Sequence, residues 1–237
     1  MSSTTHPIGT LYVVATPIGN LDDVTLRALE TLKAVDVIFA EDTRVIAKLL
    51  ARMAIEKPLH RYDEHAHESA SQAIIALLRE GKKVALVSDA GTPGIADPGS
   101  RLVARVRDEV VDAHIVPIPG VSAVTTILSV SGMNANQFVF LGYPPHKKGR
   151  KTFFESLKTN EIWPVVIYES PHRIEKALAS ISEVCGGART VVVGRELTKI
   201  HEDIWKGPIE EARVIFSEAG GDKNRIKGEF VIVIAQQ

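Results

Sequence analysis

Short apolar runs rich in β-branched residues alternate along the chain with longer segments in which apolar residues recur every three or four positions. A short run of this kind is typical of a buried strand, and the longer spacing is typical of an amphipathic helix. Their alternation predicts βα units around a largely parallel sheet, so we expect an α/β protein. Strands are expected at 11–15, 35–40, 83–87, 115–118, 138–141, 165–168, 190–193 and 229–234.

The pattern breaks twice near the middle of the chain. Small and turn-prone residues interrupt it at 117–120 (PIPG) and at 131–137 (SGMNANQ). A length of 237 residues also allows two compact halves, each with its own core. We therefore predict two α/β domains, 1–118 and 119–237, with a helix that starts near Val121 as the bridge between them.

Composition narrows the functional classes. Hydrophobic residues make up 45% and charged residues 24%, as in an ordinary soluble protein, and neither a signal peptide nor a membrane span is recognisable. Because Cys185 is the only cysteine, no disulfide and no thiolate metal site can form within one chain, which favours the cytoplasm. The net charge of −1 means that a nucleic-acid partner requires a local basic patch.

Three segments combine an apolar strand, a turn with proline and glycine, and a helix start: 13–23, 84–103 and 116–124. Glycine lets a ligand approach the backbone closely, and ligands of open α/β sheets bind at the carboxyl ends of strands. We expect the three loops to line one cleft with free backbone amides and the carboxylate of Asp89; the plainer alternative is a set of turns. Asp97 before Pro98 predicts a helix N-cap. Neither G-x-G-x-x-G nor a P-loop is present, so NAD and nucleoside triphosphates are not expected.

Two charged motifs follow predicted strands and supply candidate catalytic groups. FAEDTR contains Glu41, Asp42 and Arg44, and GRELTK contains Glu196 and Lys199. Adjacent carboxylates at a sheet edge raise a pKa by repulsion, which suits a general base. Lys199 can stabilise a developing alkoxide or, if desolvated, act as the base itself. The alternative for Asp42 is a cap of a helix that begins near Thr43, with Arg44 as its solvated partner.

The most basic stretch, HKKGRK (146–151), is a candidate phosphate-binding segment, with a solvated loop as the alternative. His60, His65 and His67 are interpreted as a polar loop and helix start, and no metal site is expected. His172 is a candidate for RNA or cofactor contact. The candidate RNA-binding residues are Lys147, Lys148, Arg150, His172 and Arg173.

Taken together, GTLYVVATPIGNLDD, FAEDTR, VSDAGTPGIADPG, PIPGVSA, FLGYPP, YESPHR, GRELTK and KGEF resemble the family that 2′-O-methylates a cytidine ribose in the decoding region of small-subunit (16S) rRNA. That family belongs to the tetrapyrrole methylase superfamily. The resemblance implies two α/β domains, S-adenosyl-L-methionine bound in a cleft between them, a small ribosomal subunit as substrate, and a homodimer.

Matching the motifs residue by residue implies cofactor contacts from both halves. They are Pro17, Asp89, Ala90, Ile95, Ser122, Ala123, Tyr168, Leu197, Lys227 and Gly228. Two departures from the family concern substrate handling: Asp63 and Ala66 alter a His-acid-His-Asn pattern, and no helical extension follows the KGEF segment. Two rivals stay open, a precorrin-type tetrapyrrole C-methyltransferase and an inactive cofactor- or ribosome-binding module.

Overall fold

The computed structural model describes residues 8–220 and 224–236, and the chain divides into two compact units. The first unit ends at Ser122 and the second begins at Ala123. Helix α5 (Ala123–Ser131), which the sequence suggested as a bridge, therefore belongs wholly to the second unit. In the described part of the chain, no helix combines the length and apolar character needed to cross a membrane.

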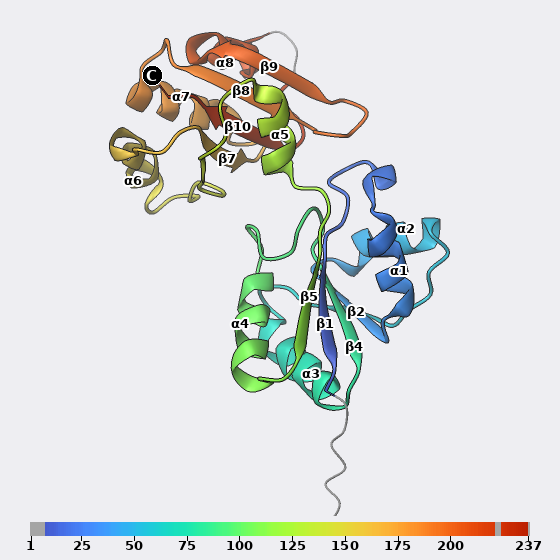
Figure 1. Ribbon diagram of the computed structural model, residues 1–237. Coiled ribbons are helices and arrows are strands. Elements are labelled where there is room, and N and C mark those ends of the chain that lie inside the picture. The colour runs from blue at the N-terminus through green and yellow to red at the C-terminus, as the bar shows by residue number, and fades with distance from the viewer. Residues whose placement is uncertain (1–7, 221–223, 237) are drawn as a thin grey trace, which may run out of the picture. The chain divides into compact units, whose positions relative to one another are not determined.

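The first unit is built on a parallel sheet, as predicted, but the sheet has five strands where the sequence predicted four. Its strands lie in the order β3-β2-β4-β1-β5. Helices α1 and α2 cover one face and α3 and α4 cover the other (Figure 1). The elements are β1 (Thr10–Val14), η1 (Leu21–Asp23), α1 (Leu26–Ala34), β2 (Val37–Ala40), α2 (Thr43–Arg52), β3 (Leu59–Arg61), α3 (His67–Arg79), β4 (Lys83–Val87), α4 (Gly99–Glu109) and β5 (His114–Ile118).

Burial on both faces explains why the central strands are nearly continuous apolar runs. In β4, Val84 and Leu86 pack with α3 and α4, whereas Ala85 and Val87 pack on the opposite face. Every residue of β2 is buried. Such strands lack the alternation of polar residues that a half-exposed strand shows.

The second unit departs from the predicted parallel arrangement. Its order is β6-β7-β10-β8-β9, and only β6 and β7 run parallel. The prediction was wrong here because β8 is joined to β9 by a short connection, which an antiparallel pair permits, and because β10 inserts between β7 and β8. The strands are β6 (Val139–Phe140), β7 (Val165–Glu169), β8 (Thr190–Arg195), β9 (Asp203–Pro208) and β10 (Phe230–Ile234).

Helices cover this second sheet unequally. A large cluster packs α6 (Arg150–Glu155), η2 (Ser156–Thr159), α7 (Ile174–Cys185) and α8 (Ile209–Ile215) against one face, and η3 (Glu218–Gly220) follows α8. On the other face, Ile127 of α5 packs so closely on Gly194 that an added Cβ would lie 2.7 Å from its Cδ1. The glycine that opens GRELTK is thus needed for helix packing.

Strands β3 (Leu59–Arg61) and β9 were not predicted from the sequence. Strand β3 has three residues and directly follows Pro58. Strand β9 contains a glycine and ends in a proline, and its residues alternate between half-buried and exposed. Both lie at sheet edges, where a strand needs no continuous apolar run.

Candidate functional site

Three loops of the first unit meet at one edge of its sheet, as the sequence predicted. In chain order the first follows β1, the second β4 and the third β5, and because these strands are neighbours and run parallel, their carboxyl ends coincide. Thr16 and Gly91 exchange two backbone hydrogen bonds, of 2.9 and 3.0 Å, across the first two loops. The Thr92 hydroxyl lies 3.4 Å from the carbonyl oxygen of Val121, joining the second loop to the third.

Glycine allows this close approach. An added Cβ on Gly120 would lie 2.9 Å from Cβ of Ala15, and Gly91 has a φ of +78°. The expectation of free backbone amides needs correction, however, because the N–H groups of Thr16, Gly91 and Gly94 all donate to protein oxygens. These amides stabilise the loops and are not available to a ligand.

Asp97 organises the second loop. Its carboxylate accepts hydrogen bonds from the N–H of Gly94 (2.8 Å) and of Gly99 (2.7 Å), the second at the start of α4. The helix begins at Gly99, one residue later than the N-cap prediction implied. Ala96 has a φ of +65°, an unfavourable conformation for a residue with a Cβ. The loop is thus tightly folded around this carboxylate.

The predicted cofactor residues of the first unit lie on these loops. Asp89 accepts a 2.7 Å hydrogen bond from the N–H of Asp42 through Oδ1, and burial raises the pKa of its carboxyl. Ala90 and Ile95 are exposed, and Pro17 is buried. At the end of the third loop, Ser122 and Ala123 are both half-buried.

Glu41 and Asp42 are neighbours in sequence, but their surroundings differ. The half-buried Glu41 side chain has no hydrogen-bond or ion-pair partner among the described residues. Burial raises its pKa, and the negative charges of Asp89, Asp97, Asp63 and Glu64 raise it further. The repulsion predicted for this carboxyl therefore comes mainly from residues far away in sequence.

Asp42 instead is the helix cap that the sequence offered as the alternative to a catalytic role. Its side chain accepts from the N–H of Arg44 and caps α2, and its Oδ2 lies 2.6 Å from the Arg44 guanidinium. The hydrogen bonds from Arg44 lower the pKa of Asp42 to about 2. So acidic a carboxyl is a weak base, and Glu41, with a raised pKa and no partner, is the better candidate for proton transfer.

In the second unit, the GRELTK and KGEF segments form one charged cluster. Lys199 Nζ lies 2.8 Å from Glu196 Oε1 and 2.9 Å from Glu229 Oε2. Burial acts to lower the pKa of Lys199, but the two carboxylates outweigh it and raise that pKa. Lys199 is thus held as a cation, which does not suit the role of a base.

Gly228 lies against this cluster. Its φ is +90°, and an added Cβ would lie 2.3 Å from Cγ of Glu196. Arg195 is buried and donates to the carbonyl oxygens of Lys227 (2.8 Å) and His201 (2.8 Å). Glu196 and Thr198 have φ values of +49° and +67°. Unfavourable backbone in a well-bonded loop is common at functional sites.

Tyr168 and Leu197 occupy the same edge of the second sheet, because the ends of β7 and β8 adjoin the start of the antiparallel β10. The Tyr168 ring packs on Phe140 and Tyr143, with centroids 4.8 and 5.3 Å apart. Leu197 is buried. The sequence-predicted residues of this unit are therefore brought together by its topology.

The candidate RNA-binding residues separate into two groups. Lys147, Lys148 and His172 are exposed. Arg150 and Arg173 each form a 3.0 Å ion pair with Glu169, whose side chain is fully buried. The two arginines thus hold neighbouring segments together. Sequence reasoning missed Glu169, although a carboxylate at the end of an apolar strand was a signal of an internal partner.

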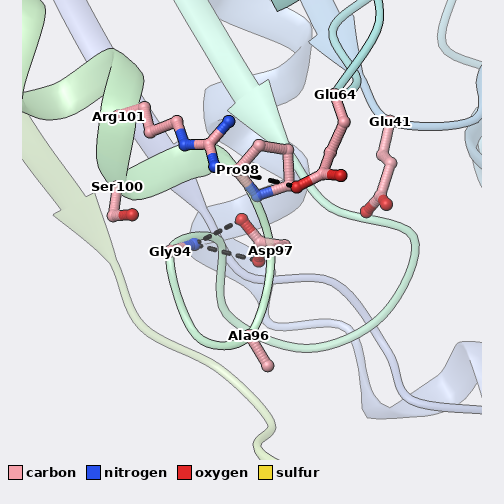
Figure 2. Close-up of a pocket in the computed structure, with 8 residues that line it drawn as sticks. All are labelled: Glu41, Glu64, Gly94, Ala96, Asp97, Pro98, Ser100 and Arg101. Atoms are coloured by element: carbon pink, nitrogen blue, oxygen red, sulfur yellow. Dashed lines mark hydrogen bonds and ion pairs between the residues drawn. The ribbon is translucent and has the colours of Figure 1, made fainter. Parts of the chain in front are cut away.

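A pocket of about 420 Å³ in the first unit adjoins Glu41 (Figure 2). Two of its polar residues, Glu64 and Arg101, were not recognised from sequence. In the ranges that the structure covers, no group of three or more His, Cys, Asp or Glu side chains is arranged to hold a metal ion. The pocket is lined by Glu41, Glu64, Gly94, Ala96, Asp97, Pro98, Ser100 and Arg101.

Comparison with known proteins gives consistent matches. The family model for tetrapyrrole (corrin/porphyrin) methylases matches residues 10–213. A protein from Synechocystis sp. named ribosomal RNA small subunit methyltransferase I is 44% identical over 96% of this chain and 79% of its own length. A protein of the same name from Thermotoga maritima is 42% identical over 96% of this chain and 99% of its own length.

Solved structures share the fold at much lower identity. Diphthine synthase superposes with a TM-score of 0.72 at 15% identity, covering 97% of this chain and 91% of its own. A uroporphyrin-III-C-methyltransferase from Thermus thermophilus gives a TM-score of 0.67 at 19% identity, covering 96% and 94%.

Proposed function

Since the chain belongs to the tetrapyrrole (corrin/porphyrin) methylase family, we propose that it transfers the methyl group of S-adenosyl-L-methionine to the 2′-hydroxyl of a cytidine ribose in small-subunit (16S) rRNA. One observation carries this proposal. Relatives named for small-subunit rRNA methylation are 42% and 44% identical over 96% of the chain. Two tetrapyrrole methyltransferases of known structure, the uroporphyrin-III-C-methyltransferase and a cobalt precorrin-4 methyltransferase, are 19% and 18% identical to this chain, which favours the rRNA substrate over the precorrin-type alternative.

The loops of the first unit suit the proposed donor. Asp89 uses one carboxylate oxygen for the N–H of Asp42, and its Oδ2 has no hydrogen bond within the described chain. A carboxylate at a strand end is a suitable acceptor for ribose hydroxyls of a nucleoside cofactor. Ala90, the next residue along the chain, and Ile95, on the same loop, are exposed. Tyr168, Leu197, Lys227 and Gly228 stay predicted contacts from the second unit.

Glu41 is the residue that best suits proton removal. The donor carries its methyl group on a sulfonium, a good leaving group, so the donor needs no further activation. The acceptor hydroxyl is a poor nucleophile until its proton is removed, so it needs a positioned base. Glu41 has a raised pKa and no competing partner, and it lines an open pocket. In the proposed reaction it takes the hydroxyl proton as the oxygen bonds to the methyl carbon and the carbon–sulfur bond breaks.

The other predicted residues receive narrower roles. Asp42 and Arg44 fix the start of α2, directly after Glu41. Glu196 and Lys199 shape the loop that packs on Gly228. Lys147, Lys148 and His172 are the exposed candidates for phosphate contact. We propose a cytoplasmic location and a homodimer, and sedimentation of the purified protein tests the dimer.

The decisive experiment incubates the purified protein with methyl-labelled donor and small ribosomal subunits from cells that lack this gene. We expect one labelled cytidine, with the label on the 2′-oxygen by mass spectrometry of the digested RNA. Methylation of uroporphyrinogen in place of RNA would support the tetrapyrrole alternative. Donor binding by calorimetry without transfer to any subunit preparation would support the inactive module.

A further inference from the structure

The pocket beside Glu41 has polar groups that the protein leaves available. Asp97 is not one of them, because Gly94 and Gly99 donate to it. Glu64 and Arg101 reach toward each other at 3.9 Å, with exposed side-chain fractions of 71% and 61% (Figure 2). Such a long and exposed pair contributes little to stability. The available charged groups are therefore one unpaired carboxyl, Glu41, and one loosely held carboxylate–guanidinium pair.

A second observation concerns Tyr62, which borders a small cavity next to the pocket. Tyr62 is 2% exposed, and its hydroxyl makes no hydrogen bond of regular geometry with the described residues. The nearby Ser71 hydroxyl offsets only part of the rise in pKa that burial causes. Tyr62 borders a cavity of about 10 Å³ that shares Glu41, Asp97 and Pro98 with the larger pocket. Buried tyrosine hydroxyls normally have a well-formed hydrogen bond, so the Tyr62 hydroxyl is a further polar group that a ligand in this site can use.

Glu64 and Arg101 match the hydrogen-bonding edge of cytosine. Cytosine presents an exocyclic amino donor beside ring-nitrogen and carbonyl acceptors, and carboxylates are the usual acceptors for that amino group in proteins. Arg101 supplies only donors, which suit the two acceptors. Uracil would place a carbonyl oxygen against the Glu64 carboxylate and a ring N–H against the guanidinium. The pair would therefore accept cytosine and reject uracil.

We propose that this pocket holds the acceptor nucleoside, that Glu64 and Arg101 select cytosine, and that Glu41 lies at the ribose hydroxyl. The inference rests on the proposed function and adds where the substrate binds and how it is chosen. The pocket volume, about 420 Å³, lies in the range of small-molecule sites. Adenine has a similar amino-and-acceptor edge, but in the donor it lies away from the reacting methyl. A site that contains the base residue Glu41 suits the acceptor better.

The test measures donor-saturated kcat/KM on small subunits reconstituted with either cytidine or uridine at the acceptor position. We expect wild-type protein to prefer cytidine, and Glu64→Gln to reduce that preference by roughly 5- to 150-fold, the range for one well-paired base contact. The amide of glutamine can donate to the carbonyl of uracil. Arg101→Gln is expected to reduce the same preference.

Glu68→Gln is the matched control. Glu68 is the next carboxylate along the chain, pairs with Arg105 at 2.9 Å, and does not line the pocket. The control should keep the wild-type preference. An unchanged preference in Glu64→Gln would overturn the inference. So would weaker donor binding by calorimetry in the Glu64 and Arg101 variants, because it would assign the pocket to adenine. Failure of the proposed function looks different, since wild-type protein would then methylate neither subunit.

Discussion

The two units use charged residues in opposite ways at the edges of their sheets. In the first, Glu41 faces other carboxylates and has no partner, and burial with their repulsion raises its pKa. In the second, Glu196 is bound by Lys199. Burial acts to raise the pKa of Glu196, but the hydrogen bonds from Lys199 and from the N–H of Glu229 outweigh it and lower that pKa. A glutamate just past a strand is thus available for chemistry in one unit and committed to structure in the other.

Glu41→Gln is expected to break this contrast with the largest effect. The variant keeps the shape of the side chain but cannot accept the proton. A positioned base typically contributes about 10²–10⁴-fold, so we expect a loss of that size in single-turnover methylation of small subunits. Glu56→Gln, at an exposed glutamate outside the pocket, is the control and should be near wild type. Retention of the full rate in Glu41→Gln would remove Glu41 from the mechanism.

Gly228→Ala disturbs the charged cluster of Glu196, Lys199 and Glu229 in the second unit. The new Cβ would overlap the Glu196 side chain and push its carboxylate away from Lys199. Gly149→Ala is matched for backbone conformation, with a φ of +87°, but its nearest neighbour is Pro145 Cγ at 3.9 Å. In thermal or denaturant unfolding, we expect Gly228→Ala to lose roughly 1–3 kcal/mol more than Gly149→Ala, the usual cost of overpacking. Equal losses would mean that the cluster tolerates displacement of Glu196.

The pH dependence of stability tests Glu41 without any substrate. Because its pKa is raised in the folded state, the carboxyl favours folding most when it is protonated, below its ordinary value of 4.5. That contribution is lost as pH rises through the folded-state pKa. We therefore expect Glu41→Gln to melt at a higher temperature than wild type at pH 7, with the difference closing as pH falls below 4.5. A constant difference, or one of opposite sign, would contradict the raised pKa.

The same experiment gives an expectation for catalysis. The proposed mechanism uses ionised Glu41 as the base, so the methylation rate of wild-type protein should fall as pH decreases through the raised pKa. Asp89, Asp97, Asp63 and Glu64 shape this titration, since their charges act on Glu41. Glu64→Gln should therefore move the acidic limb to lower pH.

The sequence was informative where one strand and its following loop determine a feature. Glu41 and Asp89 each follow an apolar run, and parallel strands place such positions at one edge. The sequence did not reveal that Glu64 meets Arg101, because one precedes α3 and the other lies in α4. Their meeting depends on strand order and helix packing, which hydrophobic periodicity does not encode. The same holds for the pairing of Glu169 with Arg150 and Arg173.

The smallest expected effect is at the residue next to Glu41. Asparagine is as good an N-cap as aspartate, so Asp42→Asn keeps the start of α2. Arg44 loses its charged partner, but its side chain is 88% exposed, and such surface pairs contribute little. We expect kcat/KM within about twofold of wild type, since a carboxyl with a pKa of about 2 is a poor proton acceptor. A loss as large as that of Glu41→Gln would make Asp42 the base, and an ion pair with a neighbouring cation would then not exclude a carboxylate, Glu196 included, from the chemistry.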